Sequence, residues 1–592
     1  MQASGINPAP KRFRVGDWLI EADACTLSRG EETRHIRPLL IELLILLAER
    51  AGQVVTKDEI LDHVWSGRFV SESALTRNMT ELRHVLGEAA GAPQIIETIP
   101  RRGYRLIAPV EVVGKAGPPR LAVLPFENLN HDPEQDYFAE GISDALITEL
   151  GSIRSLRVIS RQSVLRYKGS SKSLPEIARE LKVEAIVEGS ALHLGKRVRI
   201  TAQLIQADPD QHLWARSYEG ELRDILHLQG RVARAIAESV QAILTPNDLA
   251  RLSRPRTANP EAYIACLKGR YHLRHWTRDS IAKGFDYLQR AIDIDPDYAP
   301  AYTHLAEGLA VLGYWGHLPF GPAYTRAKAV VSKALEIDDS LSDAHLVLGI
   351  ACWLLDWDFD RCEREMQRAL ELNPSLQIAH LFYAKFLVTM RDRREEALRE
   401  AALGLELDPL SVNTNFSFAY SLVFAGEYDR AYAQAVSTLE AFPDCLHAWY
   451  VRGWAELGRG RYAAAVAAFE KAAALSSDAI SLAYLAHALG RAGQASRARA
   501  ILKKLLARRA GEYIAEFVFF LVYSGLGDRD AAFKCLEKCY AERDGRLFWL
   551  QVVPCFEPLR DDPRFADLAR RLGLPPQPTA KRLRLSASPS LR

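Results

Sequence analysis

Five polar side chains share one face of a predicted helix, and their types suit contact with the bases of a nucleic acid. They are Ser73, Arg77, Thr80, Glu81 and His84. The opposite face is apolar at helical spacing, which predicts that it packs inward. Its residues are Leu75, Met79, Leu82 and Leu86. With Ser71 as the expected N-cap and Gly87 as the stop, the sequence predicts a helix over residues 72–86. Side chains that donate and accept hydrogen bonds can read base edges from a helix in a major groove.

Two adjacent arginines, Arg101 and Arg102, follow at the tip of a predicted β-hairpin. β-Branched residues precede Pro100, and aromatic and apolar residues follow Gly103, so the hairpin is expected over residues 95–107. A basic hairpin tip suits contact with phosphates or with a narrow minor groove. A competing hypothesis is that these arginines are ordinary solvated surface charges.

The elements that must hold the helix and the hairpin lie upstream of them. Three short strands are expected over residues 13–15, 18–21 and 33–36. A helix opened by Pro38 follows, and the string AGQVVTKDEILDHVW precedes the polar-faced helix.

These strings carry a resemblance to a known family. Residues 13–109 resemble the effector domain of the OmpR/PhoB winged-helix family, with G-x-V-V-T-K-x-E-I-L-x-x-V-W and E-T-I-P-R-R-G-Y-R-L as the matching strings. The resemblance implies a DNA-binding winged helix over residues 12–113. It also implies that helix 72–86 enters the major groove and that wing 95–107 contacts the backbone or minor groove.

The net charge of this region does not favour DNA binding. Residues 1–113 contain 14 Lys and Arg against 15 Asp and Glu, whereas non-specific DNA affinity comes mostly from phosphate neutralisation. Binding would therefore depend on local placement, with Glu31, Glu32, Asp58 and Glu59 turned away from the DNA.

The whole chain has the composition of a large multidomain protein. Its 592 residues predict three or more domains, its 48% apolar residues suffice for packed cores, and its net charge of +2 says little about partners. No membrane span or signal peptide is found and the eight cysteines are scattered, so a reducing, cytoplasmic location is expected. Cys535 and Cys539 are one helical turn apart without nearby histidines, which favours buried packing over metal binding.

Residues 120–245 alternate between strand and helix patterns. The expected order is strand 120–126, helix 137–153, strand 156–160, helix 174–183, strands 185–192, 197–207 and 213–220, and a closing helix over 222–244. Two βαβ units predict parallel pairing, and the later strands predict an antiparallel extension. The strings LAVLPFENL, YFAEGISDALITEL and LWARSYEG resemble the TolB amino-terminal (FlgO-like) domain.

No catalytic motif stands out in this middle domain, so neither enzyme activity nor a cofactor is expected. The sequence has no Gly-rich phosphate loop after a strand, no G-x-S-x-G and no H-E-x-x-H. An acidic run suits a loop and the first turn of a helix better than a cation site, because carboxylates favour the helix dipole there. The run consists of Asp132, Glu134, Asp136 and Glu140. The domain is a candidate sensor or spacer.

Residues 256–573 repeat with the period of tetratricopeptide repeats. The markers are Pro374, Pro409, Pro443 and Ser477, which are 35, 34 and 34 residues apart. The clearest repeat has Trp449, Gly453, Ala465, Phe469 and Ala472 as signature residues. Its small residues should let two helices approach, and its large ones should fill the space between repeats. Residues 312–327 are expected to form an extended turn, with a binding surface as the alternative, and residues 575–592 a disordered tail.

The sequence therefore predicts a multidomain fold: an α+β winged helix, an α/β mixed-sheet domain and an all-α tetratricopeptide solenoid. The architecture resembles that of CadC- and HilA-type transcriptional regulators. The expected partners are double-stranded promoter DNA, RNA polymerase and an unknown protein or peptide on the repeats. The first alternative is a tetratricopeptide interaction scaffold whose winged helix does not bind DNA, and a cyclase-like enzyme is a distant third.

Overall fold

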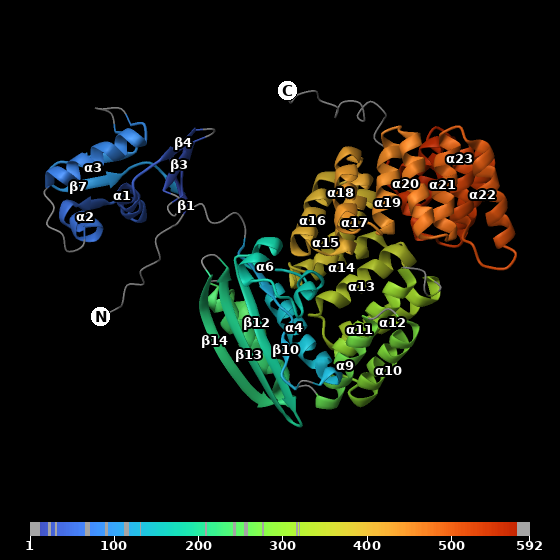
Figure 1. Cartoon of the computed structure of the whole chain (residues 1–592), viewed down its shortest axis with the longest axis horizontal. Coiled ribbons are helices and arrows are strands. Elements are labelled where there is room, and N and C mark those ends of the chain that lie inside the picture. Colours follow the sequence, from blue (N-terminus) through green and yellow to red (C-terminus); the bar gives the residue numbers. More distant parts are fainter. Residues whose placement is uncertain are drawn as a thin grey trace. The chain divides into compact units, whose positions relative to one another are not determined.

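The computed structural model of the protein describes residues 12–21, 25–29, 32–65, 72–88, 93–111, 118–130, 132–207, 210–240, 244–253, 259–274, 277–314, 318 and 320–576. The chain forms two compact units, Met1–Pro118 and Pro119–Arg592. The expected succession of a winged helix, a mixed sheet and a helical array is confirmed (Figure 1).

The first unit combines two small sheets with three helices. Its strands are β1 (Arg12–Val15), β2 (Trp18–Glu21), β3 (Thr26–Arg29), β4 (Glu32–His35), β5 (Val54–Thr56), β6 (Ile96–Ile99), β7 (Gly103–Leu106) and β8 (Val110–Glu111). Its helices are α1 (Pro38–Glu49), α2 (Lys57–Val64) and α3 (Glu72–Val85). The sheets have the orders β4-β3-β2-β1-β8 and β5-β7-β6. Strand β3 was not predicted, because its sequence TLSR has a single large apolar residue and no visible alternation.

A single core holds this unit together. The four inward residues predicted for α3 are at most 2% exposed and pack with the first sheet and α1. In the wing, β7 lies directly against β5, and a Cβ atom at Gly103 would come within 1.9 Å of the Val55 carbonyl oxygen. Position 103 therefore requires glycine, whatever the role of its arginine neighbours.

The second unit begins with a mixed sheet. Its strands are β9 (Arg120–Val123), β10 (Glu127–Asn128), β11 (Arg157–Val158), β12 (Ala185–Leu194), β13 (Arg197–Ala207) and β14 (Asp210–Glu221). The order is β11-β9-β12-β13-β14, with β10 also beside β12. As the sequence predicts, β11, β9 and β12 are parallel, whereas β12, β13 and β14 are antiparallel.

Helices cover both faces of this sheet. They are α4 (Asp136–Gly151), α5 (Arg161–Val164), α6 (Leu174–Leu181), α7 (Ile225–Ser239) and α8 (Pro246–Ser253). Along β9, Leu121 and Val123 join the core under α4 and α7, whereas Ala122 joins the core under α5 and α6, as the alternation of a strand requires. The predicted closing helix over 222–244 was too long, because a 3-10 turn over Leu222–Asp224 precedes α7.

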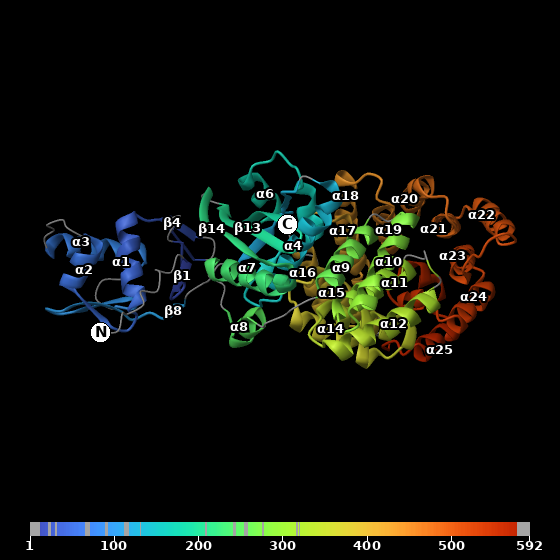
Figure 2. The same ribbon diagram turned by 90° about the horizontal axis from the view of Figure 1, so that it is seen from below.

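The rest of the second unit is a series of helices that pack in successive pairs (Figure 2). They are α9 (Pro260–Leu273), α10 (Arg278–Ile294), α11 (Ala299–Tyr314), α12 (Phe320–Ile337), α13 (Ser342–Ala351), α14 (Phe359–Leu372), α15 (Gln377–Met390), α16 (Arg394–Leu407), α17 (Val412–Ala425), α18 (Tyr428–Ala441), α19 (Leu446–Gly458), α20 (Tyr462–Leu475), α21 (Ala479–Arg491), α22 (Ala495–Arg508), α23 (Glu516–Leu526), α24 (Arg529–Ala541) and α25 (Pro563–Arg571).

The register of the clearest repeat agrees with the sequence. Phe469 is fully buried, and a Cβ atom at Gly453 would lie 2.4 Å from its ring. Glycine on α19 therefore lets the ring on α20 enter the space between the paired helices. By contrast, the extended turn expected over residues 312–327 is wrong at both ends, because α11 continues to Tyr314 and α12 already begins at Phe320. Pro322 is tolerated there, since the first turn of a helix leaves its N–H groups without partners in any case.

The segment after α24 folds back on the repeats. The Phe548 ring lies 6.1 Å from that of Trp353, and the Trp549 ring lies 5.9 Å from that of Phe424. Cys535 and Cys539 are buried within α24 itself, and burial raises the pKa of both thiols. Most of the tail expected over residues 575–592, including its basic residues, lies outside the described residues.

The mixed sheet and the repeats share one continuous junction. Tyr263 and Leu267 of α9 lie in the same core as α4 and α7. The Ser163 hydroxyl donates to Asp408 at 2.7 Å, and the Val158 N–H donates to the Ser375 hydroxyl at 3.2 Å. The expected boundary between residues 245 and 256 is therefore a boundary in sequence pattern rather than in packing. Among all these described elements, no helix has both the length and the apolar character needed to cross a membrane.

Candidate nucleic-acid interface

Helix α3 presents the polar face that its sequence predicts. Ser73, Arg77, Thr80 and His84 lie on this face with Glu81, and most of their side chains are exposed. The Thr80 hydroxyl donates to the Thr76 carbonyl oxygen at 2.9 Å, so its oxygen remains available as a hydrogen-bond acceptor. The expected N-cap Ser71 lies outside the described residues.

Glu81 is held by a residue that sequence analysis missed. The Arg37 guanidinium donates to both carboxylate oxygens of Glu81, with Nε at 2.9 Å, and to the Asn78 side chain at 3.1 Å. Arg37 immediately precedes α1, so this contact spans 44 residues and leaves no local signal. Glu81 is thereby neutralised, and Arg37 brings a positive charge to the polar face of α3.

Two contacts anchor the C-terminal end of α3 to the first sheet. The Trp18 indole N–H donates to the Leu86 carbonyl oxygen at 2.8 Å, and Arg34 donates to the Val85 carbonyl oxygen at 2.6 Å. The Arg34 guanidinium also lies 4.8 Å from the centre of the Trp18 ring. These bonds satisfy carbonyl groups that a helix end leaves open, and they fix the direction of the helix.

The N-terminal end of α3 is tied to α2. The Lys57 ammonium lies 2.5 Å from the Glu72 carboxylate. Helix α2 is itself closed by a capping box, in which Thr56 and Glu59 bond each other's backbone N–H groups. The Thr56 backbone N–H, followed by Arg50, lowers the pKa of Glu59 to about 2.

The wing carries Arg101 and Arg102 at its exposed tip. Arg101 has a φ of 62°, and the Arg102 carbonyl oxygen accepts from the Lys57 N–H at 3.2 Å. Arg83 joins the wing to α3, since its Nη2 donates to the Ile96 carbonyl oxygen at 2.9 Å and to the Thr98 hydroxyl at 2.7 Å. The helix and hairpin that carry the candidate residues are thus one connected surface.

The charges of this unit are distributed unevenly. Most of its described basic side chains are paired with carboxylates, in the pairs Arg29–Glu32, Arg34–Glu32, Arg37–Glu81, Arg50–Glu59, Lys57–Glu72, Arg83–Glu88 and Arg105–Glu97. Arg77, Arg101 and Arg102 make no side-chain hydrogen bond or ion pair with the described residues, and the same is true of Arg14 on β1. Six acids and seven bases are thus engaged in structural pairs, whereas the arginines of α3 and the wing tip keep their donors available.

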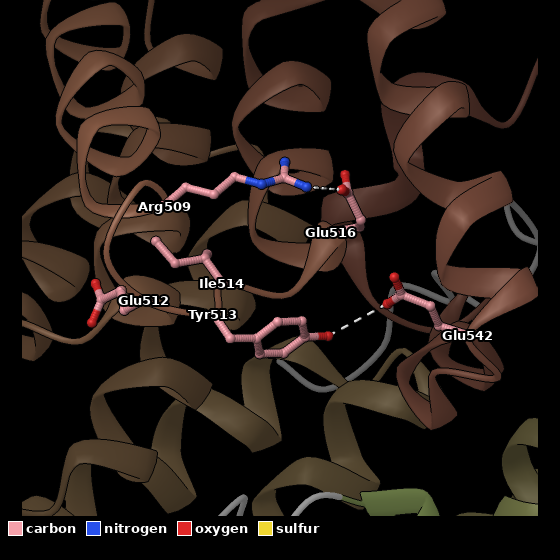
Figure 3. Close-up of a pocket in the computed structure, with 6 residues that line it drawn as sticks. All are labelled: Arg509, Glu512, Tyr513, Ile514, Glu516 and Glu542. Carbon is pink, nitrogen blue, oxygen red and sulfur yellow. Dashed lines mark hydrogen bonds and ion pairs between the residues drawn. The ribbon is translucent and has the colours of Figure 1, made fainter.

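The repeats contain a small pocket of about 150 Å³, lined by the loop after α22, the first residue of α23 and the residue after α24 (Figure 3). Each of its charged groups has a partner, and Glu512 pairs with Arg508 just outside the pocket. Arg509 contacts Glu516 at 2.5 Å, and the Tyr513 hydroxyl donates to Glu542 at 3.4 Å. Within the described parts of the chain, no cluster of His, Cys, Asp and Glu could hold a metal ion.

The acidic run of the mixed-sheet region is occupied by local and ionic contacts. Asp132 caps the 3-10 turn before α4, and Lys168 contacts both Asp136 and Glu140 at 2.9 Å. Asp132 and Asp136 agree with the prediction of a loop and a helix start, whereas Glu140 is buried in the second turn of α4 and pairs with Arg161 at 2.7 Å.

Family comparisons match two parts of the chain. A family described as transcriptional regulatory protein, C terminal, matches residues 31–106, which include α3 and the wing. A tetratricopeptide repeat family matches residues 416–480, from α17 to the start of α21.

Individual relatives match different lengths of the chain. It is 34% identical over 243 residues to "Putative adenylate cyclase 3" of Rhizobium meliloti (strain 1021), covering 40% of each chain. It is 24% identical over 358 residues to "Transcriptional regulator HilA" of Salmonella typhimurium, covering 58% of this chain and 62% of HilA. It is 37% identical over 98 residues to "Transcriptional activator CadC" of Escherichia coli (strain K12), covering 16% of this chain and 19% of CadC. The chain spans less than two thirds of each of these relatives.

Proposed function

The chain carries an OmpR/PhoB-type winged-helix domain and tetratricopeptide repeats, and on that premise we propose that it is a transcriptional regulator that binds promoter DNA with sequence preference. The two relatives with regulator names, HilA and CadC, support this function. No catalytic step is part of the proposal.

The observation that carries the proposal is the set of free guanidinium groups on α3 and the wing. The unit has more acids than bases, and six of its described acids are bound to arginines and lysines that hold the fold together. Arg77, Arg101 and Arg102 are left exposed with their donors available. Guanidinium groups bind base edges and phosphates through paired hydrogen bonds, so the charge needed for DNA lies on this one surface.

In the proposed complex, α3 enters the major groove. Arg77 and Thr80 then reach base edges, and Ser73, His84 and the Arg37–Glu81 pair border the contact. Arg101 and Arg102 lie across the phosphates or in the adjacent minor groove. The bonds from Trp18 and Arg34 to the end of α3 keep the helix in the orientation that this contact needs.

The second unit is proposed to receive the input and to contact proteins, including RNA polymerase. Its mixed sheet and repeats pack as one unit, so a ligand or protein that binds either part would affect both. The mixed sheet resembles a TolB amino-terminal domain in sequence, and we propose that it acts as a sensor joined to the repeats.

The test is DNA binding by the full-length protein to promoter fragments of its own genome. The variant Arg77→Ala with Arg101→Ala and Arg102→Ala should lower affinity for a mapped site by at least about 30-fold, because a base contact alone is worth about 1–3 kcal/mol. Arg14→Ala is the matched control, since Arg14 is also an exposed arginine without a partner in the described structure, and it should bind like the unmodified protein.

A protein that folds but shows no salt-sensitive DNA binding would rule out the proposal and favour the scaffold function. If only overall charge mattered, Arg14→Ala would lose about a third of the binding free energy that the triple variant loses, because it removes one charge instead of three; a loss of that size would contradict a specific interface.

A further inference from the structure

A cleft of about 600 Å³ lies at the junction between the mixed sheet and the repeats. Arg154 and Arg157 enter it from the loop and strand after α4, and α14 to α16 form the other wall. The lining residues from the repeats include Gln367, Glu371, Tyr383 and Glu396. The opening is broad and solvent-accessible, and it lies at a junction between domains, where small-molecule sites often occur.

Neither arginine in the cleft has a partner. Arg154 is exposed and Arg157 is half-buried, and neither guanidinium makes a hydrogen bond or ion pair with the described residues. Other arginines of the same junction are paired: Arg161 and Arg274 both contact Asp144, and Arg120 lies 3.5 Å from Glu406.

Arg157 is the informative member of the two. Burial lowers the pKa of its guanidinium, while Glu406 and Glu400 attract it only from a distance. The Arg157 guanidinium is partly desolvated and none of its donors is taken by a described residue, so it can donate to an anion that enters the opening. Arg154 is exposed, so water can satisfy its guanidinium. It nevertheless brings a second set of hydrogen-bond donors to the same opening.

The acids on the opposite wall are largely neutralised by their own neighbours. Glu396 is contacted by Arg393 at 2.6 Å, and Glu371 lies 3.4 Å from Arg368. The Tyr383 hydroxyl accepts from Gln367 at 2.9 Å. The cleft is therefore polar and hydrogen-bonding on the repeat side and positive on the sheet side.

We propose that this cleft binds a small anionic ligand through a carboxylate or phosphate group held by Arg154 and Arg157. The ligand would contact the sheet and the repeats at once. The idea that the cleft is the input site of a regulator depends on the proposed function. The idea that it binds an anion depends only on the geometry of the cleft.

The test is isothermal titration calorimetry of the full-length protein with inorganic phosphate and, separately, with succinate, each at constant ionic strength in chloride. Saturable binding of at least one anion is expected, and the better of the two identifies the group that the cleft prefers. Arg157→Gln and Arg154→Gln should each weaken that binding by about tenfold or more, because a charge-assisted hydrogen bond is removed. Arg179→Gln, an exposed arginine on α6 outside the cleft, should leave it unchanged.

Absence of saturable binding with both anions would overturn the proposal, as would equal binding in the unmodified protein and both cleft variants. Arg154→Gln guards against a folding artefact, because Arg154 is exposed and makes no contact that the fold needs. The assay contains no DNA, so its failure would leave the winged-helix proposal standing, and loss of DNA binding would leave the anion site standing.

Discussion

Arg77 and the wing arginines should be separable by their effects on sequence preference. Arg77 lies on the exposed face of α3, so Arg77→Ala should weaken binding to the best site by about 1–3 kcal/mol and leave random DNA nearly unaffected. Arg101→Ala with Arg102→Ala should weaken both kinds of DNA alike, and should lower the salt slope by about 0.9 for each phosphate that the wing no longer neutralises. Titrations of a mapped and a scrambled site at several salt concentrations measure both quantities.

The opposite pattern would reverse these roles. If the wing variant alone changes sequence preference, the wing reads bases in the minor groove and α3 only positions the domain. The variant Glu81→Gln can be measured in the same titrations to test Arg37. It removes the strongest partner of Arg37 and adds no charge to the helix.

At the scale of the element, α2 should lose stability in acid through its capping box. The Glu59 carboxylate has a pKa of about 2 in the folded protein, below its ordinary value of 4.5. A depressed pKa means that the stabilisation is present above about 4.5 and is lost as the pH falls through about 2. Glu59→Gln should therefore lower the Tm of the Met1–Pro118 unit most near neutral pH, and the difference from the unmodified unit should shrink as the solution is acidified.

Thermal unfolding followed by circular dichroism from about pH 6 to about pH 3 gives this difference. The unit has its own core, so it can be measured alone. Asp62→Asn provides the control, since Asp62 is exposed on the same helix and takes no part in the cap. A constant Tm difference across the range would contradict the role given to Glu59.

At the scale of the whole molecule, the junction between sheet and repeats should depend on Asp408. This carboxylate is 1% exposed and accepts from Ser163 at 2.7 Å and from Thr414 at 2.6 Å. Asp408→Ala leaves two buried hydroxyls without their acceptor, which costs about 1–3 kcal/mol for each group. Hydrogen exchange should then accelerate in α5 and at Leu410, whose N–H donates to Ser163, while the winged helix keeps its protection.

The control variant is Asp444→Ala, which replaces an aspartate of the repeats that lies outside the junction. Asp444 is exposed in a turn of the following repeat, and its replacement should leave α5 unchanged. Equal acceleration in both variants would mean that the repeats loosen as a whole and that the junction has no special dependence on Asp408.

Local patterns in the sequence were enough to predict much of this protein. The two faces of α3, the hairpin around Arg101 and Arg102, and the period that places Gly453 opposite Phe469 all follow from residues close together in the chain. Such features have a periodicity that is visible without any partner. Where the local pattern was weak, as in β3, or where proline suggested a break, as before α12, the prediction failed.

Tertiary structure alone decided which of these side chains are available. Arg37 neutralises Glu81 across 44 residues, and no described acid of the first unit pairs with Arg77. The cleft at the junction joins Arg157 to Tyr383, which lie far apart in the chain. Charge pairing and burial depend on neighbours that folding brings from distant parts of the chain, so a sequence read locally gives the type of a residue but not its partners.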